Sequence, residues 1–150
     1  MASFLVWNLS GQLVGYHQYR PGADKTKKNN PKEGRYYTYL TKPDDKNRSL
    51  GVWGLETYAY RDDVLCMTEG VFDACRLHNL GIPAVAMFSN DPAHLRPWLA
   101  VISKWKIGFR DNDDAGKRLI KYVDECRVMT LKDLGDSTDE EIFKMVRDLL

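Results

Sequence analysis

Four acidic residues of the sequence have the types and spacing needed to bind divalent cations: Glu69, Asp73, Asp111 and Asp113. Glu69 directly follows the apolar run 64–68, and Asp73 comes one helical turn later. Asp111 and Asp113 are two residues apart, so in an extended segment their side chains face the same side. Converging carboxylates repel one another unless cations lie between them. Mg²⁺ or Mn²⁺ suits such a cluster, because hard ions prefer oxygen ligands and also bind substrate phosphates during phosphoryl transfer.

Each acidic group also has an ordinary structural explanation. A Glu-Gly pair after a strand is commonly just a turn. The Asp-Asn-Asp-Asp run at 111–114 is a common start of a helix, because acids suit the positive end of the helix dipole. The order of the two groups favours a functional site. A Glu-Gly pair and an Asp-x-Asp-x-Ala-Gly motif each follow an apolar segment, about forty residues apart, with a strand and a helix predicted between them.

The elements that must position these acids alternate between strand and helix from about residue 62 onward. Apolar runs predict strands at 64–68, 84–88, 105–109 and 127–130. Helical spacing, a Pro in the first turn after Asn90, and a capping box of Ser137 with Glu140 predict helices at 70–79, 90–102, 115–125 and 137–149. This order is typical of an α/β fold with a mostly parallel sheet flanked by helices. Ligands of such sheets bind beyond the carboxyl ends of the strands, where the four acids would lie.

The first sixty residues have a different character. Aromatic and apolar runs predict strands at 4–7, 12–19 and 36–40, the first two joined by a Ser-Gly turn, with polar loops after the second and third. Between residues 20 and 48, nine basic residues stand against four acidic ones, so this segment carries +5 and the rest of the chain −4. We therefore expect a small β-rich basic lobe at 1–60 and an α/β domain at 61–150. A basic part that attracts phosphates beside an acidic part that holds cations suits a nucleic-acid enzyme.

The composition excludes several classes of protein. Hydrophobic residues make up 43% of the chain and charged residues 29%, which argues against global disorder. No apolar run approaches the roughly 18 residues of a membrane span, and the N-terminus lacks the pattern of a secretory signal. Cys66, Cys75 and Cys126 are too widely spaced for a disulfide framework or a zinc site. We expect a cytoplasmic protein with reduced thiols, no zinc site and no membrane partner.

Two segments resemble the signature motifs of the TOPRIM domain: LCMTEGVFDACRLHN at 65–79 and FRDNDDAGKRL at 109–119. This domain is shared by bacterial-type DNA primases, topoisomerases, recombination mediators and some nucleases. The resemblance covers roughly residues 62–133. It implies that Glu69 is the conserved glutamate, that Asp111 and Asp113 are the paired metal-binding aspartates, and that Asp73 is the acid one turn after the glutamate. Glu69, Asp111 and Asp113 would thus be catalytic.

In the catalytic core of bacterial and phage primases, a small basic lobe precedes the TOPRIM domain. The order of segments in the N-terminal lobe of this chain is similar to that of the primase lobe. The likeness rests on three segments in this order: Leu13-Val14-Gly15-Tyr16, the Arg-Tyr-Tyr-Thr-Tyr-Leu run at 35–40, and Trp53-Gly54-Leu55. The run at 132–136 resembles an acidic turn of primases, which makes Asp133 a further metal-binding acid. By resemblance, the chain is a primase-like nucleotidyltransferase of a bacterial or phage-infected host cytoplasm. It would synthesise RNA primers on single-stranded DNA from nucleoside triphosphates.

The chain departs from these primases in two respects. The cysteines of an N-terminal zinc module are absent, and there is no P-loop of an attached helicase. Either this is an excised catalytic core, or it is a small protein that takes template recognition from a separate zinc-binding or helicase partner.

Basic residues of the lobe are candidates for binding template or nucleotide phosphates. Arg20, Arg35 and Lys42 lie beside predicted strands, and Lys117 follows the acidic pair; a solvated helix face is the alternative for Lys117. Lysines of the first polar loop are equally consistent with keeping that loop soluble. Five interleaved tyrosines either stack on bases or belong to a core: Tyr16, Tyr19, Tyr36, Tyr37 and Tyr39.

Two rival functions remain open. A TOPRIM nuclease would use the same metals to cleave nucleic acid, although such nucleases generally lack the basic lobe. A non-catalytic binding module would use the domain for contacts alone, although retention of all four acids argues against that. A topoisomerase needs a tyrosine nucleophile on a further domain, for which this chain is too short.

Overall fold

In the computed structural model, which describes residues 1–25, 31–89, 91–129 and 134–150, the chain divides into two compact units. The first is Met1–Trp53 and the second is Gly54–Leu150. The sequence placed the boundary after residue 60. The difference comes from the 3-10 helix η2 (Leu55–Tyr60), which is tied to the second unit by the buried Thr57. Its hydroxyl accepts a hydrogen bond from Ala84 N at 3.0 Å and also contacts Ala84 O.

The second unit is built on a parallel sheet in the order β5-β4-β6-β7. Its strands are β4 (Val64–Thr68), β5 (Ala84–Ala86), β6 (Trp105–Asp111) and β7 (Glu125–Met129). All residues of β4 and β5 are buried, as expected for strands covered on both faces. The predicted mostly parallel sheet is thereby confirmed, and β4 lies in its interior with β6 as a direct neighbour.

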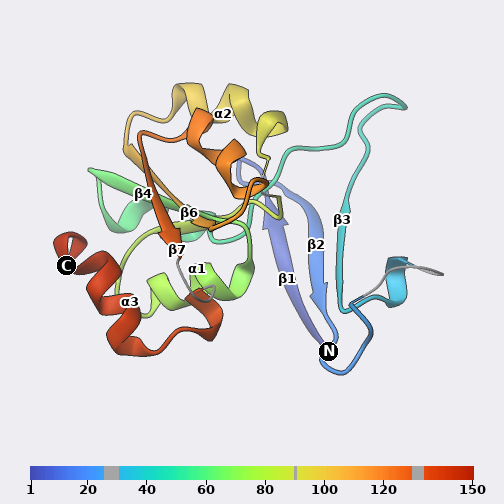
Figure 1. Ribbon diagram of the computed structural model, residues 1–150. Coiled ribbons are helices and arrows are strands. Elements are labelled where there is room, and N and C mark those ends of the chain that lie inside the picture. Colours follow the sequence, from blue (N-terminus) through green and yellow to red (C-terminus); the bar gives the residue numbers. More distant parts are fainter. Residues whose placement is uncertain (26–30, 90, 130–133) are drawn as a thin grey trace. The chain divides into compact units, whose positions relative to one another are not determined.

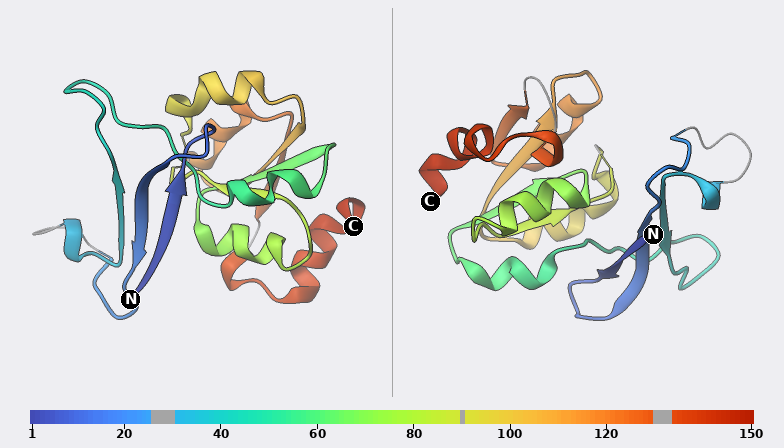
Figure 2. Two further views of the ribbon diagram at one scale, coloured as in Figure 1. Left: turned by 180° about the vertical axis from the view of Figure 1, so that it is seen from behind. Right: turned by 90° about the horizontal axis from the view of Figure 1, so that it is seen from below.

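Helices cover both faces of this sheet (Figures 1 and 2). The α-helices are α1 (Val71–His78), α2 (Arg96–Val101) and α3 (Asp139–Val146). The 3-10 helices of this unit besides η2 are η3 (Ala93–Leu95), η4 (Gly116–Tyr122), η5 (Leu134–Asp136) and η6 (Arg147–Leu149). Figures 1 and 2 show α1 and α3 on one face, with α2 and η4 on the other. An ion pair between Arg76 and Asp139 at 2.5 Å links α1 to α3.

Several predicted helices differ in detail. The segment predicted as a helix at 115–125 is a 3-10 helix that ends at Tyr122, because Glu125 already belongs to β7. The capping box of α3 is formed by Thr138 and Glu141, one residue later than predicted. The sequence satisfies the Ser/Thr-x-x-Glu pattern at both positions, so local sequence cannot distinguish them.

The first unit is an antiparallel sheet in the order β1-β2-β3, referred to below as the small sheet. Its strands are β1 (Ala2–Trp7), β2 (Leu13–Tyr19) and β3 (Tyr36–Leu40), and the 3-10 helix η1 (Pro31–Glu33) precedes β3. The predicted β-rich lobe is confirmed in its secondary structure. All nine basic and four acidic residues of the 20–48 segment belong to this unit, which therefore carries +5 while Gly54–Leu150 carries −4.

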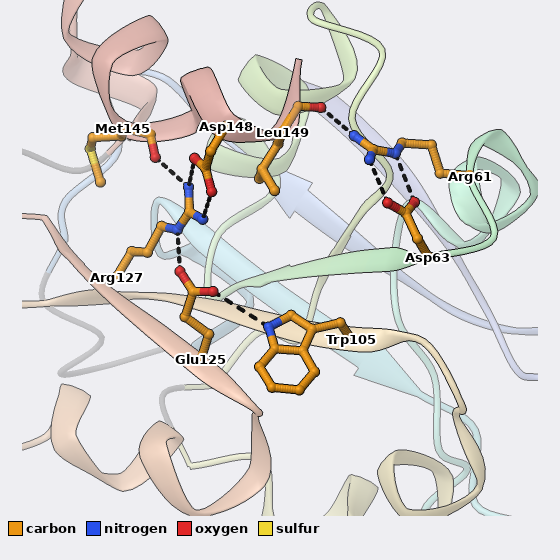
Figure 3. A network of polar contacts seen from close by, with 8 residues as sticks. All are labelled: Arg61, Asp63, Trp105, Glu125, Arg127, Met145, Asp148 and Leu149. Carbon is orange, nitrogen blue, oxygen red and sulfur yellow. Dashed lines mark hydrogen bonds and ion pairs between the residues drawn. The ribbon is translucent and has the colours of Figure 1, made fainter.

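Two arginines bind the C-terminal segment, which contains α3 and η6, to the rest of the second unit (Figure 3). Arg127 on β7 donates to Asp148 at 2.6 Å and to Glu125 at 2.8 Å, and it also reaches the carbonyl of Met145. Arg61 pairs with Asp63 and donates to the carbonyl of Leu149.

Among the described residues, no helix is long and apolar enough to cross a membrane.

Candidate metal and nucleotide site

Glu69 and Asp111 lie at the same edge of the parallel sheet because their strands are neighbours. Met67 of β4 is paired with Gly108 in the middle of β6, so in this register Glu69 comes level with Arg110, one residue before Asp111. Glu69 directly follows β4, and Asp111 is the last residue of β6. The carboxyl ends of parallel strands form the edge at which α/β proteins bind ligands. The structure therefore brings two of the predicted acids together where the sequence analysis expected them.

The three acids Glu69, Asp111 and Asp113 influence one another electrostatically. The pKa of the Glu69 carboxyl is raised above its ordinary value, first by partial desolvation and then by repulsion from Asp111 and Asp113. Both aspartates are exposed to solvent. Both causes disfavour the charged form of the Glu69 carboxyl, and a nearby cation would favour it. The three acids are therefore near enough for Asp111 and Asp113 to act on the charge of Glu69.

Asp113 is positioned by a turn and not by an extended segment. Strand β6 ends at Asp111, and Asp113 Oδ1 accepts a hydrogen bond from Gly116 N at 2.6 Å. A Cβ atom added to Gly116 would lie 2.5 Å from Asp111 O and 3.1 Å from Asp113 Oδ1. The expectation that both aspartates face one side of an extended chain is therefore replaced by a tight loop. That loop needs a glycine at 116 to fold against the aspartates.

Asp73 has different surroundings from the other acids. It lies on α1 one turn after Glu69, as predicted, but its side chain is buried, with 8% exposure. Its Oδ1 accepts a hydrogen bond from Gly135 N at 2.8 Å, and its Oδ2 lies 2.9 Å from the position of a Cβ on Gly70. Asp73 thus connects the start of α1 to η5, sixty-two residues later in the chain. Asp133, the further acid predicted near this point, lies outside the described residues.

The donor set of the edge fits Mg²⁺ or Mn²⁺ in its chemistry. Glu69, Asp111 and Asp113 offer only carboxylate oxygens and are accessible enough to leave coordination positions for water and phosphate. In the described ranges, no three Asp, Glu, His or Cys side chains are already gathered closely enough to hold one ion.

Two basic residues follow the loop of Asp111 and Asp113 in the sequence, and one residue with an unusual backbone is hydrogen-bonded to Glu69. Lys117, predicted to reach a phosphate, pairs with Asp114 at 2.6 Å, and Arg118 approaches Asp91 at 4.0 Å. Both ion pairs are largely exposed and therefore weak, so Lys117 and Arg118 can leave these acids to bind another anion. Phe88, after β5, has a positive φ of 60° and donates its N–H to Glu69 O at 2.9 Å. Sequence reasoning missed Phe88, because nothing in a Met-Phe-Ser run signals a left-handed backbone; such strain is concentrated at functional sites.

The predicted basic residues of the first unit lie at both ends of β3. Arg20 and Arg35 are together at one end, where Arg20 N donates to Arg35 O at 2.8 Å. The Arg20 guanidinium donates to Gln18 Oε1 at 2.7 Å, and Arg35 Nε donates to Ala23 O at 3.0 Å. Lys42 follows the other end of β3 and is exposed. The structure therefore groups two of these cations and separates the third.

Comparisons with known proteins identify the fold. No known protein-family profile matches the sequence, and no curated protein matches it by sequence. Among solved structures, it is similar to the RNA polymerase domain of Mycobacterium tuberculosis primase DnaG, with a TM-score of 0.61 and 18% identity. That alignment covers 97% of this chain and 54% of the other.

Two further structures give the same answer. The zinc-binding and RNA polymerase domains of the Aquifex aeolicus primase align with a TM-score of 0.58 and 21% identity, over 95% of this chain and 36% of that one. A DNA primase domain from Pseudomonas aeruginosa aligns with a TM-score of 0.56 and 19% identity, over 95% and 46%. The chain spans about half the length of the mycobacterial domain. The resemblance stated from the sequence is thus confirmed for the fold: the chain has the TOPRIM-like α/β fold, with a preceding small sheet, of primase RNA polymerase domains.

Proposed function

We propose that this chain is a metal-dependent nucleotidyltransferase that acts on single-stranded DNA and synthesises RNA primers, as a primase does. The observation that supports the proposal most directly is the placement of Glu69, Asp111 and Asp113. They lie at the ends of two adjacent parallel strands, and the pKa of Glu69 is raised by partial desolvation and then by repulsion from Asp111 and Asp113. The fold likeness to primase RNA polymerase domains, which extends over 95–97% of the chain, supports the same reaction class.

In the proposed reaction, a 3′-hydroxyl attacks the α-phosphate of an incoming nucleoside triphosphate, and pyrophosphate leaves. Glu69, Asp111 and Asp113 would hold Mg²⁺ or Mn²⁺, which supplies the charge that stabilises the attacking and leaving oxygens. Asp73 would act as a positioning residue, because its carboxylate holds η5 against the start of α1. Arg20, Arg35 and Lys42 would bind phosphates of the template or the nucleotide. No side chain acts as a covalent nucleophile in this scheme.

The test is a denaturing gel of end-labelled single-stranded DNA and labelled nucleoside triphosphates, incubated with the protein and Mg²⁺ or Mn²⁺. Glu69→Gln and Asp111→Asn are run alongside, because both remove a charge and keep the size of the side chain. We expect new short products with the wild type, and at least about a 100-fold loss in either variant, the scale of effect when a key electrostatic group is removed.

Two controls separate this function from its rivals. Glu140→Gln changes an exposed acid on α3 and should leave product formation unchanged. Shortened template without new products would replace the primase with a nuclease. The third outcome is intact DNA binding with neither new products nor shortened template, even when a zinc-binding partner is supplied. That outcome would replace the primase with a non-catalytic binding module.

Cation binding has a readout that does not require turnover. Titration of Mn²⁺ followed by electron paramagnetic resonance should show bound ion with the wild type and weaker binding with Asp111→Asn. The same titration of Glu140→Gln should match the wild type. Equal binding by all three proteins would remove Asp111 from the cation site.

A further inference from the structure

The small sheet has one face that is rich in aromatic side chains. Along a strand, successive side chains alternate between faces, and residues directly opposite on antiparallel strands share a face. Tyr16 is paired with Leu5 on one side and with Tyr39 on the other, and Gln18 is paired with Tyr37. These five residues therefore lie on one face, which we call the tyrosine face.

The rings of the tyrosine face are arranged as a platform. Tyr16 and Tyr39 are stacked, with centroids 5.4 Å apart and an angle of 26° between planes. Tyr37, two residues before Tyr39 on β3, is tilted against Tyr16, with centroids 6.3 Å apart and an angle of 58° between planes. Offset stacking holds both rings of the first pair in place, so an incoming flat group meets an ordered surface. Tyr39 remains 43% exposed and Leu5 48% exposed, so the platform is accessible.

The core of the first unit uses the opposite face of the small sheet. There Phe4 packs edge-on against Trp53 with centroids 5.7 Å apart, and the buried His17 bonds Thr38 through Nδ1 and Oγ1 at 2.8 Å. Tyr36 stacks on His17 with centroids 5.9 Å apart. The tyrosines of β3 are thus divided by alternation: Tyr36 belongs to the core-forming face, and Tyr37 and Tyr39 belong to the other.

Positive charge lies at the end of the tyrosine face. Arg20 donates from Nη2 to Gln18 Oε1 at 2.7 Å, so its guanidinium is held beside a residue of that face. The unit as a whole carries +5. A stacked aromatic pair with a cation at the end of its face, on a positively charged unit, is complementary to a strand whose bases stack and whose phosphates are anionic.

We propose that the tyrosine face binds single-stranded DNA by stacking bases on the Tyr16–Tyr39 pair, with Arg20 contacting a phosphate. That the bound strand is the template for primer synthesis rests on the function proposed above. The stacking of bases on the tyrosines does not depend on that function. Since every base has a π-face, binding of this kind tolerates any sequence.

Strand β3 supplies a matched pair of variants for the test. Tyr39 and Tyr36 are the same residue type on the same strand, with exposures of 43% and 38%, but they lie on opposite faces. Binding of a fluorescent oligothymidylate is measured by anisotropy without nucleotides. We expect Tyr39→Ala to weaken binding about 5-fold or more. Tyr39→Trp, which keeps an aromatic surface, and Tyr36→Ala should stay within about 2-fold of the wild type.

Salt dependence adds a readout that damage to the sheet would not produce. Stacking releases no counterions, so Tyr39→Ala should keep the wild-type slope of log affinity against log salt. Arg20→Gln should reduce that slope by about 0.7, the value for one phosphate contact to a single strand. Circular dichroism and thermal unfolding of each variant verify that the sheet is intact.

The outcomes separate this proposal from the proposed function. Equal affinity of Tyr39→Ala and the wild type overturns the stacking proposal, even if primers are made. An equal loss in Tyr36→Ala and Tyr39→Ala also overturns it, because the effect would then come from the sheet as a whole. A selective loss in Tyr39→Ala supports stacking even if the wild type makes no primer, in which case the proposed function alone fails.

Discussion

At the residue scale, the loop of the two aspartates depends on Gly116. A methyl group at this position would lie 2.5 Å from the backbone oxygen of Asp111, which cannot move without displacing the end of β6. We expect Gly116→Ala to lower the free energy of unfolding by about 1–3 kcal/mol, as overpacking does. We also expect it to abolish the primer synthesis proposed above, because Asp111 and Asp113 would shift. Thermal unfolding and the gel assay measure these two effects.

Gly108 provides the matched control for that substitution. It is buried in the middle of β6, and an added methyl group would meet side-chain atoms of Leu119, 2.7 Å away, instead of backbone. Gly108→Ala should therefore lose a similar amount of stability and keep much more of its activity at a temperature where both variants are folded. Equal activities of the two variants would show that the loop of Asp111 and Asp113 does not depend on the close approach of Asp111 O to Gly116.

At the scale of elements, Arg127 connects β7 to the C-terminal helices through Asp148. The hydrogen bond from Arg127 lowers the pKa of the Asp148 carboxyl below its ordinary value. A lowered pKa means that the folded state favours the charged form, so this contribution is present at neutral pH. It disappears as pH falls through the lowered pKa. Asp148→Asn should thus lower the melting temperature at pH 7, but not at strongly acidic pH.

The expected effect of Asp148→Asn is small, under about 1 kcal/mol, because the carboxylate is largely exposed. Arg127→Ala should cost more, since it removes donors to Glu125, Asp148 and the Met145 carbonyl together (Figure 3). Thermal unfolding across the pH range measures both. A difference for Asp148→Asn that grows toward acidic pH would contradict the role assigned to this pair.

At the scale of the whole molecule, charge is divided between the two units. Met1–Trp53 carries +5, and Gly54–Leu150, with thirteen basic and seventeen acidic residues, carries −4. Without divalent cations, the acidic edge should repel any DNA strand that reaches it. We therefore expect Asp111→Asn to bind single-stranded DNA more tightly than the wild type in EDTA. Added Mg²⁺ should reduce or reverse this difference.

Anisotropy titrations with and without Mg²⁺ test that expectation. Glu140→Gln removes the same charge from an exposed site on α3 and serves as the control for net charge alone. An equal gain in both variants would indicate that total charge, and not the position of Asp111, determines the repulsion.

Much of the fold was predictable from local patterns. Apolar runs predicted all the strands of the parallel sheet within a few residues, and the turn residues predicted the break between α1 and β5. Such features depend on side chains close in sequence, which periodicity reads directly. The type of η4 and the start of α3 were wrong in detail. The following strand shortens η4, and two equivalent capping patterns overlap at the start of α3.

The candidate site was predictable to the extent that it depends on strand ends. Glu69 and Asp111 were placed at the carboxyl edge because each follows an apolar run, and the structure places them there. The burial of Asp73 against Gly135 and the left-handed backbone of Phe88 were not predictable. Both depend on segments that are far apart in sequence and meet only when the chain is folded.

The sequence by itself determined the alternation of strands and helices, the acids at two strand ends and the concentration of positive charge before residue 54. Only the tertiary structure decided that β4 lies beside β6, which brings Glu69 next to Asp111. It also decided which alternate tyrosines of β3 face the core. The physical reason is the same in both cases. Strand order and the choice of a buried face follow from long-range packing, which local periodicity does not encode.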